Sequence, residues 1–338
     1  MPPSQTRFRA TLAAGLATGL VVLLGMTLWL RREMHQPAAL RERLAILVVP
    51  EGTPLKRTID ALSAAGLIGS PSAFELLARG RGLAGRIQSG THRLPGGLAP
   101  GDVLDLLVDG STRIDFVTIP EGLRGDEIAR LLETAGVGPA AGILALMRDA
   151  EFAASLGVPA RGLEGYLFPD TYALGAEPRP REVLQRLVRR FFEVWEKGPA
   201  VQARQRGLKM AEVVTLASII EEEAARAEER PTISAVFHNR LKRGMPLQSD
   251  PTVLYGVEGR AEGRIRSRDL KRATPYNTYM IRGLPPGPIS NPGLGALEAA
   301  VAPEPGLRAL YFVARNDGTH VFSETLAEHN RAVTRWQR

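Results

Sequence analysis

The stretch Met210–Arg226, MAEVVTLASIIEEEAAR, is an apolar run of helical length that ends in three consecutive glutamates. In a helix, residues three, four and seven positions apart share a face, so Val214 and Ser218 lie beneath Glu221. Successive residues are rotated by about 100°, which places Glu223 about 200° from Glu221 around the helix axis. We therefore expect the three acids to occupy different surroundings.

Glu221 stands at the end of the apolar stripe of this helix. Loss of solvation there disfavours the charged carboxylate and raises its pKa. A carboxyl that holds its proton near neutral pH suits general acid catalysis. The alternative is that EEEAARAEER, residues 221–230, forms the solvated surface of an ordinary amphipathic helix. The helical pattern alone leaves both interpretations open.

The composition indicates a globular protein of two or three compact units. The chain has 338 residues, of which 44% are hydrophobic and 23% charged, with a net charge of +7. No dense Lys/Arg cluster is interleaved with aromatic residues, so we expect no nucleic-acid partner. The charge permits a mild attraction to anionic membranes or cell-wall polymers. The absence of cysteine excludes thiol catalysis, disulfides and Cys-ligated zinc, and the five histidines show no metal-binding spacing, so no metal or cofactor is expected.

The N-terminus contains a segment of about 20 residues without a charge, between Arg9 and Arg31, which is enough to span a bilayer as a helix. No small-x-small cleavage site follows it, which argues against a signal peptide. We predict an uncleaved anchor over residues 10–30, a cytoplasmic segment over residues 1–9 and a polar linker over residues 31–44. Basic residues flank both ends of the anchor, so charge alone leaves the orientation open.

The remaining chain predicts an α+β fold with two parts. Residues 45–112 show a strand, two short helices and a second strand, followed by a capped helix. Residues 113–338 show helices, strands and long loops rich in Pro, Gly, Asn and Tyr, which are commonly functional in compact domains. A Pro-Glu-Gly turn follows a β-rich run twice, at Pro50 and at Pro120, and a helical pattern follows each turn.

The stretch LEGYLFPDTYAL, residues 163–174, is rich in aromatic residues. Tyr166, Phe168 and Tyr172 have two interpretations. They belong to the core, which is the commoner fate of aromatic residues, or they line a groove that binds a sugar.

Several motifs carry a resemblance to a known family. In order along the chain they are GTHRL, EGYLFPDTY, ASIIEEEA, VFHNRL, GMPLQSDPTVLYG, TPYNTY, GLPPGPISNPG and LYFVARNDGTHVFS. Together they resemble the YceG-like family of membrane-anchored endolytic murein transglycosylases, over roughly residues 45–335.

The resemblance implies an activity and a cellular location. It implies cleavage of the MurNAc-β-1,4-GlcNAc bond of nascent peptidoglycan strands without water, which leaves 1,6-anhydroMurNAc ends and limits strand elongation. It also implies that the catalytic part lies outside the cytoplasm of a bacterium, held to the inner membrane by the single N-terminal span. The family also implies a LysM-like βααβ unit for residues 45–112, a catalytic domain for residues 113–338, and cell-wall synthases as partners.

The resemblance also assigns roles to residues. The family's catalytic glutamate falls on Glu221 and its second acid on Glu223, which we expect to orient loops rather than transfer protons, and Glu222 receives no role. The polar residues of the matching motifs are candidates for holding the sugars: Asn239, Gln248, Asp250, Tyr255, Tyr276, Asn277 and Tyr279. The alternatives for these residues are turn formation for Asp250 and Asn277 and core packing for the tyrosines.

Three functional hypotheses remain at this level. In the first, Glu221 protonates the leaving oxygen and then accepts the proton of the sugar's own C6 hydroxyl. In the second, the chain is a membrane-anchored glycan-binding scaffold with an inert acid. In the third, it is a muramidase that uses water, for which the usual mechanisms need two carboxyls about 5 to 9.5 Å apart.

Overall fold

The computed structural model describes residues 18–22, 24–29, 44–175, 177–255 and 265–337. The predicted segment 1–9 and nearly all of the predicted linker lie outside these residues. The predicted anchor lies partly outside them, and its described residues 18–22 and 24–29 are helical. Among the helices that are described, none combines the length and the hydropathy that a membrane crossing requires.

The chain forms two compact units, which we describe separately. The first comprises Met1–Asp115 and Ala173–Ala176, and the second comprises Phe116–Tyr172 and Glu177–Arg338. The first unit contains β1 (Leu44–Val49), α2 (Leu55–Ala64), α3 (Pro71–Gly80), β2 (Gly90–Pro95) and α4 (Pro100–Asp109), and the boundary falls within β3 (Arg113–Thr118). The predicted sequence of strand, two helices, strand and helix is thus present.

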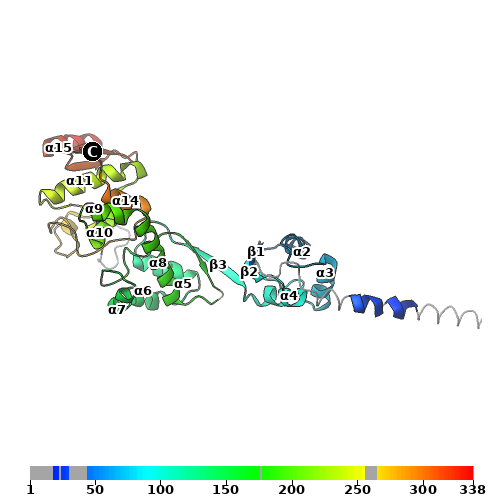
Figure 1. The fold of residues 1–338 in the computed structure, drawn as a ribbon. Helices are drawn as coiled ribbons and strands as arrows, with labels where there is room; N and C mark the ends of the chain where they lie inside the picture. The colour runs from blue at the N-terminus through cyan, green and yellow to red at the C-terminus, as the bar shows by residue number, and fades with distance from the viewer. Residues whose placement is uncertain (1–17, 23, 30–43, 176, 256–264, 338) are drawn as a thin grey trace, which may run out of the picture. The chain divides into compact units, whose positions relative to one another are not determined.

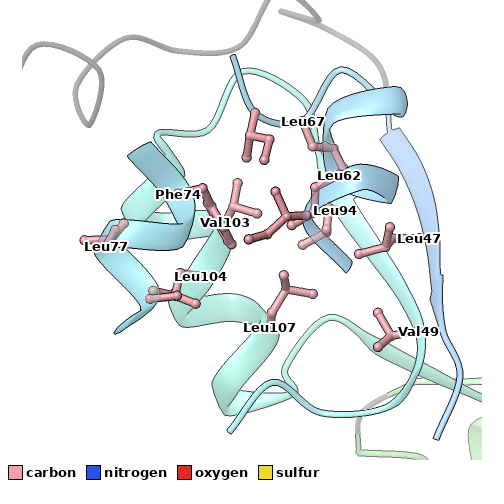
Figure 2. Close-up of a cluster of buried hydrophobic side chains, with 13 residues drawn as sticks. Leu47, Val49, Leu62, Leu67, Phe74, Leu77, Leu94, Val103, Leu104 and Leu107 are labelled. Atoms are coloured by element: carbon pink, nitrogen blue, oxygen red, sulfur yellow. The ribbon is translucent and has the colours of Figure 1, made fainter. Parts of the chain in front are cut away.

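Alternating side chains on β1 build the core of the first unit. Leu47 and Val49 are buried, whereas Ile46 and Val48 on the opposite face are exposed. Strand β1 pairs antiparallel with β2, from Leu44 opposite Pro95 to Val49 opposite Gly90. Figure 2 shows further members of this core: β2 adds Leu94, and the three helices add Leu62, Phe74, Val103, Leu104 and Leu107.

The second unit is mainly helical with little sheet. Strand β4 (Thr171–Leu174), like β3, crosses the boundary between the units, and it follows β3 in the sheet order β1-β2-β3-β4. Strand β5 (Tyr311–Ala314) pairs with β6 (His320–Ser323) in a separate antiparallel hairpin of the second unit. Its helices are α5 (Gly125–Thr134), α6 (Ala140–Met147), α7 (Ala150–Ser155), α8 (Pro180–Lys197), α9 (Pro199–Gln205), α10 (Met210–Glu223), α11 (Arg230–Lys242), α12 (Asp250–Leu254), α13 (Ser267–Leu270), α14 (Leu294–Val301) and α15 (Leu326–Trp336), with a 3-10 turn, η1 (Ala227–Glu229). Both units together give the α+β class that the sequence predicts.

Helix α10 is the centre of the second unit. Every residue from Val213 to Ile220 is buried, so the helix is enclosed on all sides rather than on one face. It packs against α9, α11, α12 and α14, and Figure 1 shows α9, α11 and α14 gathered around it. The alternative of a solvated helix surface over residues 221–230 holds only in part: Glu222 and residues 225–228 are exposed, whereas Glu221 and Glu223 are not, and α10 itself ends at Glu223.

The aromatic residues that follow Leu163 belong to the core. Tyr166, Phe168 and Tyr172 are all buried. The Tyr166 ring meets the Phe191 ring of α8 edge to face, with their centroids 5.0 Å apart. The alternative that these three rings line a sugar-binding groove is wrong, because all three are buried.

Candidate active site

Glu221 lies in the last turn of α10, where the buried helix ends. Its side chain is only 6% exposed. One carboxylate oxygen, Oε1, accepts a hydrogen bond of 2.6 Å from Nη2 of Arg230, the first residue of α11. The other oxygen, Oε2, accepts a bond of 2.9 Å from the backbone N–H of Gly293. Gly293 is the N-cap of α14, where the helix dipole favours negative charge.

Arg230 joins Glu221 to a second acid. The same Nη2 atom lies 3.2 Å from Oε2 of Glu121, in the Pro-Glu-Gly turn after β3. We call Glu121, Glu221 and Arg230 the Glu221 cluster. It brings together two segments that are far apart in the sequence, the turn at Glu121 and residues 221–230.

The surroundings of Glu221 act on its pKa in opposite directions. Burial raises the pKa of the Glu221 carboxyl above its ordinary value, and the nearby charge of Glu121 acts in the same direction. The Gly293 N–H and the Arg230 guanidinium lower it, because both stabilise the ionised form. The net shift is upward, which is the direction that the position at the end of an apolar stripe predicts.

Glu223 occupies a different environment from Glu221, as the helical spacing predicts. Its Oε1 accepts a hydrogen bond of 2.6 Å from the Ser249 hydroxyl. Burial raises the pKa of Glu223 to about 7, and the Ser249 bond opposes this shift. Between them on the helix, Glu222 is exposed. The three consecutive acids therefore do not converge on one pocket.

A further buried acid, Glu164, was not predicted as a site residue. Its carboxylate accepts hydrogen bonds from the Gly125 N–H at 3.0 Å, the Asn291 side-chain amide at 2.8 Å and the Tyr255 hydroxyl at 3.2 Å. Burial raises the pKa of Glu164 to about 7. Its Tyr255 partner packs against Tyr276, with ring centroids 4.6 Å apart.

Two loops connect Glu164 with the Glu221 cluster. Asn291 accepts a bond from the Gly122 N–H through its backbone carbonyl and donates its own N–H to the Leu123 carbonyl, both at 3.0 Å. The first loop, residues 121–125, contains Glu121 and the Gly125 N–H that bonds to Glu164. The second loop, residues 291–293, contains Asn291, which also bonds to Glu164, and the Gly293 N–H that bonds to Glu221. Asn291 is fully buried and holds these two segments together.

Three of the predicted sugar-binding residues gather beside Glu223. The Tyr279 hydroxyl donates to the Asp250 carboxylate at 2.7 Å, and Asp250 follows Ser249 directly. Gln248 has a positive φ of 52° and accepts a bond of 3.2 Å from Nη1 of Arg240. The structure thus places Gln248, Asp250 and Tyr279 near Glu223, and Tyr255 and Tyr276 near Glu164.

Asn239 and Asn277 hold backbone rather than facing either acid. The Asn239 amide donates to the carbonyls of Leu307 and Ala309. Asn277 is fully buried, and its amide donates to carbonyls within residues 269–272. For Asn277 this matches the alternative of turn formation.

No metal centre is found in the parts of the chain that the structure describes, where no three His, Asp or Glu side chains are grouped as ligands. His92 is buried and its ring bonds to the Gln88 carbonyl and the Thr112 hydroxyl. His238 bonds to the Ala300 carbonyl. The chemistry that this arrangement supports is proton transfer by carboxyl groups.

The fold and the site define a class of α+β protein in which a buried carboxyl ends a central helix. Within that class, the sequence pattern of the YceG-like family matches residues 47–335, and the chain belongs to this family. An endolytic murein transglycosylase of Bacillus subtilis (strain 168) is 31% identical over 307 residues, which cover 85% of this chain and 83% of the relative.

Two further relatives extend the comparison. An endolytic murein transglycosylase of Streptococcus pneumoniae (strain ATCC BAA-255 / R6) is 29% identical over 319 residues, and the match spans 84% of this chain but 57% of that longer protein. The crystal structure of a putative YceG-like protein from Listeria monocytogenes superposes with a TM-score of 0.63 at 31% identity, covering 85% of this chain and 98% of that chain.

Proposed function

We propose that this chain is an endolytic peptidoglycan transglycosylase, an enzyme of the lytic transglycosylase class. Its family membership and its relatives named endolytic murein transglycosylases support this function. The observation in the chain itself that carries the proposal is the nearly buried Glu221 carboxyl, held between a cation and a helix N-terminus. The substrate is the glycan strand of peptidoglycan.

The proposed reaction uses Glu221 twice. The protonated carboxyl first donates its proton to the glycosidic oxygen as the bond to the anomeric carbon of MurNAc breaks. The C6 hydroxyl of the same MurNAc then attacks that carbon and returns a proton to Glu221, which closes the 1,6-anhydro ring. Intramolecular attack has the advantage of proximity over a bound water. Arg230 and the Gly293 N–H stabilise the carboxylate that exists between the two steps.

Glu223 serves this reaction as a support. Its bond to Ser249 fixes the segment that carries Gln248 and Asp250, and Tyr279 closes on the same segment. Tyr255 and Tyr276 offer a second surface beside Glu164. We assign these groups to holding the glycan and its neighbouring loops.

The same proposal includes the cellular setting. Residues 10–30 anchor the chain in the inner membrane as a single span, and the catalytic domain, residues 113–338, acts outside the cytoplasm. Residues 45–112 form a LysM-like unit that contacts glycan, and cell-wall synthases are the expected protein partners. The uncharged N-terminal segment supports the anchor, and the β1-α2-α3-β2 order supports the LysM-like unit.

The test is product analysis with uncrosslinked glycan strands. The full-length protein is expected to give fragments with anhydro ends, which are lighter by one water than the reducing ends of a muramidase. Glu221→Gln should abolish these products, whereas Glu298→Gln, the same change at an exposed position of α14, should not. Binding without cleavage would instead support the scaffold hypothesis, and reducing ends would support a muramidase.

A further inference from the structure

One nitrogen of Arg230 is shared between two carboxylates. Its Nη2 lies 2.6 Å from Oε1 of Glu221 and 3.2 Å from Oε2 of Glu121. Arg230 is 16% exposed and Glu121 is 49% exposed, so the cation links the buried acid to one that reaches solvent. The Nε of Arg230 is buried and has no hydrogen-bond partner, so the guanidinium is not committed to any other protein group through that atom.

The backbone at the start of α14 leaves room for this bridge. A Cβ atom at Gly293 would overlap the Glu121 carboxyl, and a Cβ at Gly295 would overlap Nη1 of Arg230. Both glycines have no such atom, so the two side chains lie directly against the helix terminus. The Glu121 carboxyl therefore lies against the start of α14 as well as next to Arg230.

If Arg230 paired with Glu221 alone, it would stabilise the Glu221 carboxylate and so oppose proton donation. The ion pair and the Gly293 N–H both favour the carboxylate, whereas the first step requires the protonated carboxyl. The charged groups around Glu221 are Arg230 from α11, Glu121 from the β3–α5 turn and Glu222 from α10 itself. Of these groups, Glu121 contacts Arg230. Its negative charge also disfavours a second negative charge on Glu221.

We propose that Glu121 is a positioning residue that shares Arg230 with Glu221, so that Glu221 keeps the proton that it donates to the leaving oxygen. This inference rests on the proposed function. With Glu221 protonated, Arg230 still has an anionic partner in Glu121. Once the proton has moved to the glycosidic oxygen, the same guanidinium lies in place to stabilise the Glu221 carboxylate. The C6 hydroxyl then returns one proton, so the cycle consumes neither water nor a net proton.

The first test is the pH dependence of kcat/KM for Glu121→Gln in the full-length protein. Removing the negative charge strengthens the hold of Arg230 on the Glu221 carboxylate, so the basic limb of the profile should move to lower pH by about one unit. Above that limb the activity should fall about tenfold, while at lower pH it approaches the wild-type value. Glu121→Asp should restore part of the shift, and Glu298→Gln should leave the profile unchanged. A loss that is equal at every pH overturns the inference, because a merely structural defect would produce it.

The second test does not depend on activity. Carbon-13 labelling of the glutamate carboxyls gives a titration curve for Glu221, identified as the signal that Glu221→Gln removes. We expect its midpoint to fall in Glu121→Gln. If the wild-type protein cleaves no glycan but this midpoint moves, the proposed function fails and the pairing stands. If the protein cleaves glycan but the midpoint stays, the inference about Glu121 fails and the function stands.

Discussion

At the scale of residues, the candidate site is built from carboxyl groups whose pKa values are raised by burial. Glu164 and Glu223 both have a pKa raised to about 7, and that of Glu221 is raised as well. Each of the three nevertheless accepts hydrogen bonds that favour its ionised form. The balance leaves Glu164 and Glu223 able to change charge near pH 7 and shifts the pKa of Glu221 upward, toward the protonated form that a general acid requires.

Replacing Glu223 should reduce the pH dependence of stability. The pKa of Glu223 is raised from 4.5 to about 7 in the folded chain, so between these pH values the folded state binds more protons than the unfolded state. The free energy of unfolding should therefore fall as the pH rises through this range, by about 1–3 kcal/mol for this group, and level off above it. Denaturant titrations of Glu223→Gln at a series of pH values should show a flatter profile.

Other groups titrate in the same range, so the comparison is made against a matched change. Burial lowers the pKa of His238, which makes stability rise with pH and partly offsets the acids. The exposed Glu298→Gln variant should retain the full wild-type slope. An unchanged slope in Glu223→Gln would contradict a raised pKa at this position.

The sequence predicts Glu221 as a candidate acid but does not predict its partners. Glu221 is visible because an apolar helix ends in it, and the structure places it in a buried cluster. Glu121 and Glu164 pair with residues that are 109 and 127 positions away, and no helical or strand period connects such distant groups. The repeated Pro-Glu-Gly turn at Glu121 was the one local signal that could have pointed to the first of them.

At the scale of elements, the site is the place where the end of α10 meets the start of α14. The Glu221 carboxyl lies against the N-cap of α14, and α11 begins with the arginine that neutralises it. Two loops complete the site: the turn after β3 and the segment before α14. They are held together by backbone hydrogen bonds. Small displacements of these helices and loops are therefore expected to change the contacts of the Glu221 carboxyl directly.

Gly165 tests how tightly these elements are packed. Its φ is +84°, and a Cβ at this position would overlap Pro288 and Val214 of α10. Gly283 has the same φ of +84°, and a Cβ there would meet no atom within 4 Å, which makes it a matched control. Gly283→Ala should cost about 1–2 kcal/mol of unfolding free energy from backbone strain alone, and Gly165→Ala about 1–3 kcal/mol more from overpacking.

The measurement is chemical denaturation followed by tryptophan fluorescence, to which Trp195, buried in the second unit, contributes. Gly165→Ala should also lower activity, because the Gly165 N–H bonds to Asn291 at 2.8 Å. Equal destabilisation by the two substitutions would show that the contact of residue 165 with α10 is looser than described.

The elements themselves follow well from local patterns. A β-rich run before Pro50 predicts β1, and an apolar run of helical length predicts α10. What the pattern of α10 could not show is that neighbouring helices cover all of its sides. The aromatic stretch after Leu163 was likewise ambiguous, because only the position of α8 decides between core and groove.

At the scale of the whole molecule, the two units differ in how they are built. The first has its own hydrophobic core, in which three helices cover one face of the β1–β2 pair. The second is organised around α10 and carries all the candidate site residues. The family resemblance predicts a catalytic role for residues 113–338, whereas composition indicates only that two or three units are present.

The N-terminal segment should determine where the molecule resides. A segment of about 20 uncharged, mostly apolar residues is long enough to span a bilayer, so the full-length chain should fractionate with bacterial membranes. A chain that lacks residues 1–31 should appear in the soluble fraction with its folded units intact. Recovery of both forms in the soluble fraction would contradict the proposed anchor.

The most direct measurement of the central claim follows the fate of water in the reaction. Uncrosslinked glycan is cleaved in water labelled with a heavy oxygen isotope, and the new ends are analysed by mass spectrometry. A carboxyl that donates a proton and takes one back from the sugar's own C6 hydroxyl predicts anhydro ends without the label, and no product from Glu221→Gln. Labelled reducing ends, or unlabelled products that persist in Glu221→Gln, would contradict the account.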